Sequence, residues 1–193
     1  MSSTTAIQTN ESNEVVANAY ISLETFLEEY TNREDGAKYE WNDGTIEITE
    51  SMNQEHTAIF ILLMRLFTQT KAFQEGGGLT TETDMFTSEN QLCKPDIAFF
   101  KGAQVEKMKT GENQIAPWVA EVISKTDNFN KADSKVDEYF RAGVQLVWQI
   151  VPSSQKVYIF TSSEEVKVCR GETICSAAPV LDDFEIEARK LFE

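Results

Sequence analysis

Two apolar segments that each contain one carboxylate constrain the fold of this chain more than any other feature. Asp96 begins the apolar run 97–100, and Glu121 lies inside the strand-like run 118–124. An unpaired carboxylate within an apolar strand costs on the order of several kcal/mol. The two runs therefore suggest that a shared cation neutralises both acids.

The identity of that cation follows from the ligands. The loop between Asp96 and Glu121 is long enough for the two strands to lie side by side. Two carboxylates a few ångströms apart repel each other, so the pKa of one of them rises unless a cation lies between them. Mg²⁺ suits such a pair, because it binds one or two carboxylates together with water and phosphate oxygens. The alternative is that each carboxylate caps a strand end or pairs with Lys94 or Lys125.

A lysine near these acids is predicted on the helix that follows. The segment 130–142 has helical periodicity and ends at Gly143. Its predicted buried stripe consists of Ala132, Val136, Tyr139 and Phe140. Lys135 falls about 40° from Tyr139 around the helix, so its amine can reach back over the sheet towards Glu121. The alternative is an amphipathic lysine whose stem covers apolar surface.

The remaining chain alternates between helical and strand-like patterns. Residues 1–18 are polar and predict a flexible tail, and 19–193 predict a single domain. Helices are predicted at 23–30, 54–73, 130–142 and 186–192. Strands are predicted at 39–41, 45–48, 79–83, 92–100, 118–124, 146–151, 156–160 and 165–169, with a hairpin turn at 42–44 and a polar loop at 102–113. This order predicts a mixed sheet flanked by helices, in the α/β or mixed α+β class.

Cysteine spacing, the length of the apolar runs and the absence of known motifs argue against a disulfide-rich secreted protein, a membrane protein and several classes of enzyme. Three cysteines without metal-ligand spacing predict buried thiols in a reducing compartment. The sequence contains no signal peptide, and its longest apolar run, 58–64, is too short for a membrane helix. We therefore expect a soluble cytoplasmic protein without membrane contacts. No Walker loop, dinucleotide fingerprint, zinc spacing or serine or cysteine nucleophile motif is present.

The net charge of −15 argues against tight DNA binding, but the charge is uneven. Residues 11–50 contain eleven acids and two bases, whereas residues 121–143 contain five acids and four bases. An acidic body can therefore have a nearly neutral active face, which a divalent metal would shift further towards positive charge.

Six short motifs then occur in a recognisable order. They are Tyr39-Glu40-x-x-Asp43-Gly44, His56 early in a helix, Pro95-Asp96, Glu121-Val122-x-Ser124, Lys135-x-x-x-Tyr139 and Gly143-Val144-x-x-x-Trp148. Together they resemble the family described as "putative restriction endonuclease", a branch of the PD-(D/E)XK nuclease superfamily, over residues 22–160 and the C-terminus. The resemblance implies a restriction-endonuclease-like core with a metal site at the open end of its sheet.

The resemblance also implies roles for particular residues. Asp96 and Glu121 would bind the metal, and the peptide carbonyl of Val122 would complete its coordination. Lys135 would be the displaced motif lysine, and Glu40 a further acid near the site. The chain departs from the family pattern in its acidity and in Val151-Pro152, which stands where Asp-Pro is usual.

Two functions remain as hypotheses. The first is a DNA endonuclease dependent on Mg²⁺ or Mn²⁺, in which the metal generates hydroxide and Lys135 stabilises developing negative charge or helps to deprotonate the water. The second is a catalytically inactive nuclease-fold interaction module, which the acidic first fifty residues favour. DNA is the expected partner, and a homodimer is left open. His56, the only histidine, is assigned a structural or supporting role, and Trp41, Trp118 and Trp148 are assigned to the core.

Overall fold

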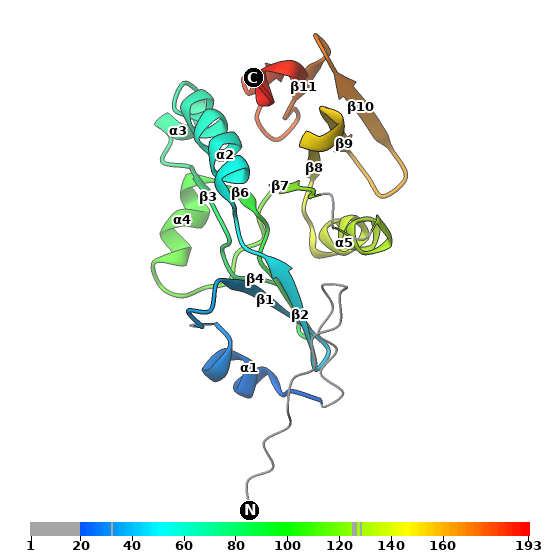
Figure 1. The fold of residues 1–193 in the computed structure, drawn as a ribbon. Helices are drawn as coiled ribbons and strands as arrows, with labels where there is room; N and C mark the ends of the chain where they lie inside the picture. Colours follow the sequence, from blue (N-terminus) through cyan, green and yellow to red (C-terminus); the bar gives the residue numbers. More distant parts are fainter. Residues whose placement is uncertain (1–19, 32, 125–126, 128) are drawn as a thin grey trace, which may run out of the picture.

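The computed structural model describes residues 20–31, 33–124, 127 and 129–193, so the tail predicted for 1–18 lies outside the described residues. The described chain forms three β-sheets with helices packed around them (Figure 1). This arrangement confirms the predicted mixed α/β class. None of the described helices is long and apolar enough to cross a membrane.

The largest sheet has six strands in the order β10-β9-β8-β7-β6-β3. These strands are β3 (Gly78–Thr80), β6 (Ile97–Phe100), β7 (Trp118–Val122), β8 (Leu146–Val151), β9 (Lys156–Phe160) and β10 (Val166–Arg170). Neighbouring strands are antiparallel except β7 and β8, which are parallel. The chain returns from the end of β7 to the start of β8 through the helix α5 (Phe129–Ala142), as a parallel pair requires.

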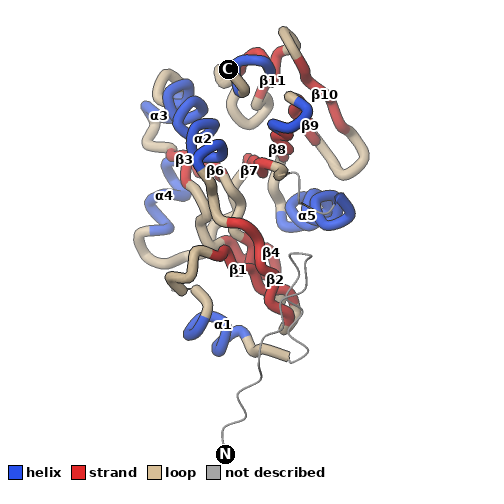
Figure 2. The backbone as a smooth tube through the Cα atoms, viewed as in Figure 1, coloured by secondary structure: helices blue, strands red, loops and turns tan. Residues whose placement is uncertain are grey.

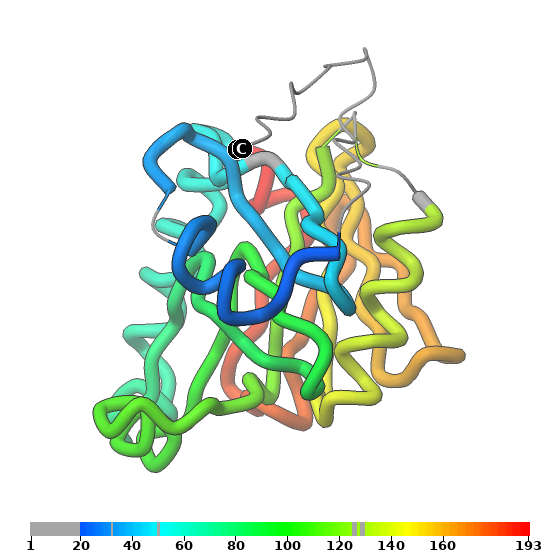
Figure 3. Tube along the Cα trace, turned by 90° about the horizontal axis from the view of Figure 1, so that it is seen from below, coloured from blue at the N-terminus to red at the C-terminus, as the bar shows by residue number. Residues whose placement is uncertain are grey.

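A second sheet of four strands lies at one end of the first, beside the helix α1 (Leu23–Glu29) (Figures 1 and 3). Its order is β2-β1-β5-β4, with β1 (Ala37–Asn42), β2 (Thr45–Glu50), β4 (Met85–Ser88) and β5 (Gln91–Cys93). The predicted hairpin is confirmed. Asp43 and Gly44 join β1 to β2 with φ angles of 44° and 82°, because a two-residue turn of this type needs positive φ at both positions.

The six-stranded sheet has an apolar cluster on each face, because side chains alternate along each strand. Ile97 and Phe99 of β6 pack with Trp118 of β7 against the helix α2 (Gln54–Phe67). Ala98 and Val119 contribute to the other cluster, which includes Val136 and Tyr139 of α5. Successive side chains of β6 and β7 therefore point alternately towards α2 and towards α5.

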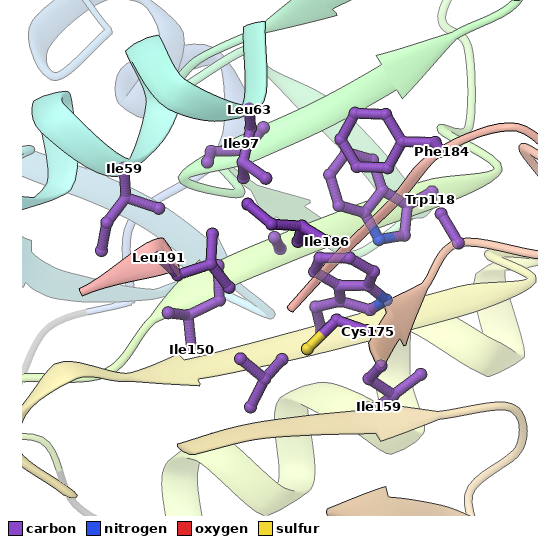
Figure 4. Close-up of a cluster of buried hydrophobic side chains, with 14 of the residues drawn as sticks. Ile59, Leu63, Ile97, Trp118, Ile150, Ile159, Cys175, Phe184, Ile186 and Leu191 are labelled. Atoms are coloured by element: carbon purple, nitrogen blue, oxygen red, sulfur yellow. The ribbon is translucent and has the colours of Figure 1, made fainter. Parts of the chain in front are cut away.

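The three tryptophans are buried, as expected for core residues. Trp118 and Trp148 meet edge to face with ring centroids 5.2 Å apart, and Phe184 packs against both rings. Figure 4 shows Trp118 and Phe184 side by side in this cluster. All three cysteines are free and buried, which agrees with the prediction of buried thiols.

Two predictions about helices are wrong. The single helix predicted over 54–73 is two helices, α2 and α3 (Lys71–Gln74), with a break between them (Figure 2). The Thr70 hydroxyl donates to the Phe67 carbonyl and accepts from the Phe73 N–H, so it closes α2 and caps α3. The polar loop predicted over 102–113 begins with the helix α4 (Gly102–Met108).

Two predictions about strands also need correction. The run 92–100 is divided between β5 and β6, which belong to different sheets. Pro95 lies between them and has no N–H to donate to a strand ladder. The helix predicted over 186–192 is the strand β12 (Glu185–Glu187), paired with β11 (Ile174–Ser176), followed by the 3₁₀ turn η2 (Ala188–Leu191). Val151-Pro152 leads into the turn η1 (Pro152–Ser154) between β8 and β9.

Candidate active site

Asp96 and Glu121 lie opposite each other on neighbouring antiparallel strands. The register pairs Ile97 with Ala120, so Asp96, one residue before β6, faces Glu121 of β7. Both side chains are on the sheet face that α5 covers, because they alternate with residues of the other face. The N–H of Asp96 donates to Glu121 Oε2 over 3.4 Å. The predicted juxtaposition of the two acids on adjacent strands is therefore confirmed.

Both carboxylates are buried, with 4% of Asp96 and 7% of Glu121 exposed, so each needs a positive partner. Lys38 Nζ lies 2.6 Å from Asp96 Oδ1, and Lys135 Nζ lies 3.1 Å from Glu121 Oε1. The alternative pairing with Lys94 is wrong, since Lys94 Nζ bonds to Asp84 at 3.0 Å. The other proposed partner, residue 125, lies outside the described residues.

Lys135 projects from α5 towards the acids, as its helical phase predicts. Its ammonium bridges Glu121 and Glu40, the latter at 2.8 Å, whereas Asp137 and Arg141 on the same helix are exposed. Burial lowers the pKa of Lys135, but the carboxylates of Glu121 and Glu40 raise it more, and the pKa is held well above its ordinary value. Lys135 is therefore protonated at neutral pH.

Tyr139 lies one turn after Lys135 and donates its hydroxyl hydrogen bond to Glu121 Oε1. Burial, and then the negative charge of Glu121, raise the pKa of the Tyr139 phenol well above its ordinary value, so the phenol is a donor at neutral pH. Sequence reasoning placed Tyr139 in the apolar stripe and in the Lys135-x-x-x-Tyr139 motif, but it assigned the hydroxyl no role at the site. A buried tyrosine hydroxyl usually has a hydrogen-bond partner, and this rule could have linked it to Glu121.

Lys38 is a site residue that sequence reasoning missed. It alternates along β1 with Tyr39 and Trp41, which pack into a separate apolar cluster, so Lys38 and Glu40 share the opposite face of the strand. Burial lowers the pKa of Lys38, while Asp96 and Glu121 raise it, and the net shift is upwards. The alternation of charged and aromatic residues in 38–41 was the available signal.

Glu40 lies close to this cluster but is separated from the other acids by Lys135. Glu40 Oε1 accepts from Lys135 Nζ and from the Lys94 N–H, each at 2.8 Å. Within the described part of the chain, no group of three or more His, Cys, Asp or Glu side chains is placed to hold a metal ion. Any metal ligands at this position would therefore come from Asp96 and Glu121 together with backbone or solvent oxygens.

That smaller donor set fits magnesium. Mg²⁺ binds through one or two carboxylates and keeps several water or phosphate ligands, and it prefers oxygen donors. Asp96 and Glu121 supply two adjacent carboxylates, and Val122, which follows Glu121, lines the same pocket. The Val122 N–H donates to Asp96 Oδ2 over 2.9 Å and so helps to fix the orientation of that carboxylate.

The acids open into a pocket between the four-stranded sheet, α2, α5 and the larger sheet. Its lining consists of Lys38, Thr49, His56, Asp96, Glu121, Val122, Ile123, Ser124, Asp127, Lys131, Ala132, Lys135 and Gln149. His56 is buried, as expected for a structural residue, yet it contributes to this lining. A pocket with carboxylates, lysines and a histidine at its walls is suited to a polar ligand that carries charge.

Comparison with known proteins identifies proteins that are similar to this chain. The family model described as "Putative restriction endonuclease" (Uma2) matches residues 23–189, which include every residue of the site. A search of curated proteins found no match. Among solved structures, a putative nuclease belonging to DUF820 from Anabaena variabilis is similar, with a TM-score of 0.75 and 20% identity. The alignment covers 89% of this chain and 97% of that chain, so the likeness extends over the whole fold.

Proposed function

The chain belongs to the family described as "Putative restriction endonuclease" (Uma2), and from this premise we propose that it is an endonuclease that hydrolyses phosphodiester bonds in DNA with Mg²⁺ or Mn²⁺. The observation that supports the proposal is the opposed pair Asp96 and Glu121, with Lys135 3.1 Å from Glu121, at the wall of one pocket. Opposed carboxylates beside a lysine are suited to a divalent ion and an anionic substrate.

Asp96 and Glu121 would hold the ion, and the peptide carbonyl of Val122 would add a further oxygen. Such an ion would supply Lewis acidity for the activation of water and for the polarisation of a phosphate. Lys38 already contacts Asp96 Oδ1 at 2.6 Å, so it would compete with the ion for that oxygen. Tyr139 and the Val122 N–H keep the two carboxylates in place by hydrogen bonding.

Lys135 has two suggested roles, and its charge favours one of them. A lysine with a raised pKa is a poor base at neutral pH, because it is already protonated. We therefore assign Lys135 to the stabilisation of negative charge on the phosphate, while Glu40 keeps the ammonium oriented at 2.8 Å.

One observation favours a catalytically inactive interaction module as the second candidate. Each of the two acids already has an ammonium partner within 3.1 Å, and the chain carries a net charge of −15. A protein that never binds metal would be stable with these internal ion pairs, and it would use the fold to bind other molecules.

Cleavage of supercoiled plasmid DNA tests the proposal. Wild-type protein should nick the plasmid with Mg²⁺ or Mn²⁺ and lose this activity with a chelator. Glu121→Gln should lower the rate by about 100-fold or more, because it removes charge that acts on the metal and on Lys135. Asp137→Asn is the matched control, since Asp137 is exposed on α5. Folded wild-type protein that leaves the plasmid intact with both metals, or Glu121→Gln that cleaves normally, would contradict the proposal.

A further inference from the structure

Two residues that line the pocket carry buried polar atoms that the proposed chemistry does not use. They are His56 Nδ1 and Thr49 Oγ1, and neither has a hydrogen-bond partner among the described residues. His56 is 4% exposed, and both side chains line the pocket that contains Asp96 and Glu121. Buried polar atoms are nearly always hydrogen bonded, so these two call for a partner that the described residues do not supply, such as an ordered water, an ion or a ligand group.

Both residues are held by regular structure. Thr49 is on β2 directly opposite Lys38, so the two side chains lie next to each other on one face of the hairpin. His56 is in the first turn of α2, where its backbone N–H donates a hydrogen bond to the Asn53 side chain at 3.1 Å. The two residues thus come from β2 and α2, whereas Glu121 and Lys135 come from β7 and α5. A ligand in the pocket is therefore enclosed by groups from two parts of the fold.

The chemistry of these groups indicates an anionic oxygen. A threonine hydroxyl donates a hydrogen bond, an imidazole donates from the ring nitrogen that carries its proton, and Lys38 adds a positive charge beside Thr49. His56 also lies at the amino end of α2, where backbone dipoles favour negative charge. A non-bridging oxygen of a phosphodiester accepts such bonds and carries the matching charge.

We propose that Thr49 and His56 bind a non-bridging phosphate oxygen of the nucleic-acid backbone in the carboxylate pocket. This assignment rests on the proposed nuclease function and adds two positioning residues to it. Thr49 donates from Oγ1 and His56 donates from Nδ1, so the phosphate is held from the side of β2 and α2 while Asp96 and Glu121 act from the sheet.

Because His56 is the only histidine, its imidazole gives a single set of NMR signals in histidine-labelled protein. The probe is thymidylyl-thymidine, whose phosphate carries one negative charge, and its control is the uncharged methylphosphonate analogue. We expect saturable shifts of the His56 signals with the phosphate and none with the analogue. Unchanged signals at high phosphate probe overturn the proposal. Equal shifts with the analogue overturn it in favour of a base or sugar contact. The same shifts with Mg²⁺ alone overturn it in favour of metal ligation.

Binding of a short DNA duplex, measured by fluorescence anisotropy with Ca²⁺ and without turnover, provides the second test. Thr49→Val and His56→Leu should each raise Kd roughly 10-fold or more, because each removes a hydrogen bond to a charged group. Thr49→Ser and His56→Asn, which keep a donor near the same place, should recover most of the affinity. Thr45→Val is the control, since Thr45 is exposed on the same strand.

These outcomes separate the subsite from the activity. Wild type that binds DNA through Thr49 and His56 but never cleaves it contradicts the nuclease function and leaves the phosphate subsite standing. Normal affinity in Thr49→Val and His56→Leu overturns the subsite whether or not wild type cleaves DNA. Lowered melting temperatures with unchanged Kd assign both residues to packing and also overturn it.

Discussion

The carboxylate of Glu138 is buried on α5 and accepts three hydrogen bonds from strands β4 and β5 of the four-stranded sheet. Its donors are Thr87 Oγ1 at 2.5 Å, Gln91 Nε2 at 2.5 Å and Cys93 Sγ at 2.6 Å. Glu138 lies one turn after Lys135, so these bonds fix the helix that carries the site lysine. Its role is to hold α5 against β4 and β5.

Glu138→Ala should lower the free energy of unfolding by about 3 kcal/mol, because it leaves three donors without their acceptor in a buried place. Glu138→Gln should have a smaller effect, since it keeps one acceptor oxygen. The exposed neighbour substitution Asp137→Asn should change stability by less than about 0.5 kcal/mol. Urea unfolding measures all three, and a Glu138→Ala protein as stable as wild type would refute this role.

Several side chains of the site could be predicted from the sequence. The others could not, because a local sequence pattern does not reveal partners that lie far away in the chain. Asp96, Glu121 and Lys135 stand out because each breaks or borders an apolar pattern, and the structure brings them together. Glu138 resembles any solvent-facing acid in a helical pattern, because its donors come from strands more than forty residues earlier in the chain. Lys38 is similar, since its partner Asp96 is 58 residues away.

Ion pairs join the β1–β2 hairpin to α5. Lys131 of α5 lies 2.8 Å from Glu47 of β2, and Lys135 lies 2.8 Å from Glu40 of β1. These contacts hold one wall of the pocket against the other. Separation of the two elements would open the site.

The Glu47 contact predicts a dependence of stability on pH. Burial raises the pKa of Glu47, but Lys131 and Asn42 lower it more, so the pKa lies below its ordinary value of 4.5. A lowered folded-state pKa gives stability that is present above the unfolded-state pKa and is lost as the pH falls through the folded-state pKa.

Wild type should therefore be more stable than Glu47→Gln at pH 7, by less than about 1 kcal/mol, and the difference should be lost as the pH falls through the lowered folded-state pKa of Glu47. Urea midpoints across this pH range measure the effect, with Glu185→Gln on β12 as an exposed control. A difference that stayed constant from pH 7 to pH 3 would show that the Glu47 charge is not responsible.

Helices and strands with a clear hydrophobic period or turn sequence could be predicted from the sequence. Elements that depend on contact with a distant segment of the chain could not. α5 and the hairpin follow from helical spacing and from Asn42-Asp43-Gly44. The start of α4 reads as a loop because of Gly102, yet a Cβ at that position would lie 2.2 Å from the Glu75 carbonyl oxygen. Gly102 is thus required by the close approach of another segment, which local sequence does not reveal.

The acidity of the chain as a unit fits a site that depends on a cation. A net charge of −15 repels a nucleic-acid backbone, and the described lining of the pocket balances Lys38, Lys131 and Lys135 against Asp96, Glu121 and Asp127. A divalent ion would give this lining a net positive charge, which would favour the proposed binding of a phosphate. The central claim of the account is therefore that Asp96 and Glu121 hold a divalent cation.

Thermal unfolding with increasing Mn²⁺ tests this claim most directly. An ion that binds only the folded protein stabilises it by about 2.7 kcal/mol at 100-fold over Kd, which corresponds to a rise in Tm of roughly 5 to 11 °C for a chain of this size. We predict this rise for wild type and for Asp137→Asn, and its loss in Asp96→Asn. A wild-type midpoint that does not move at millimolar Mn²⁺, or an equal rise in Asp96→Asn, would contradict the account.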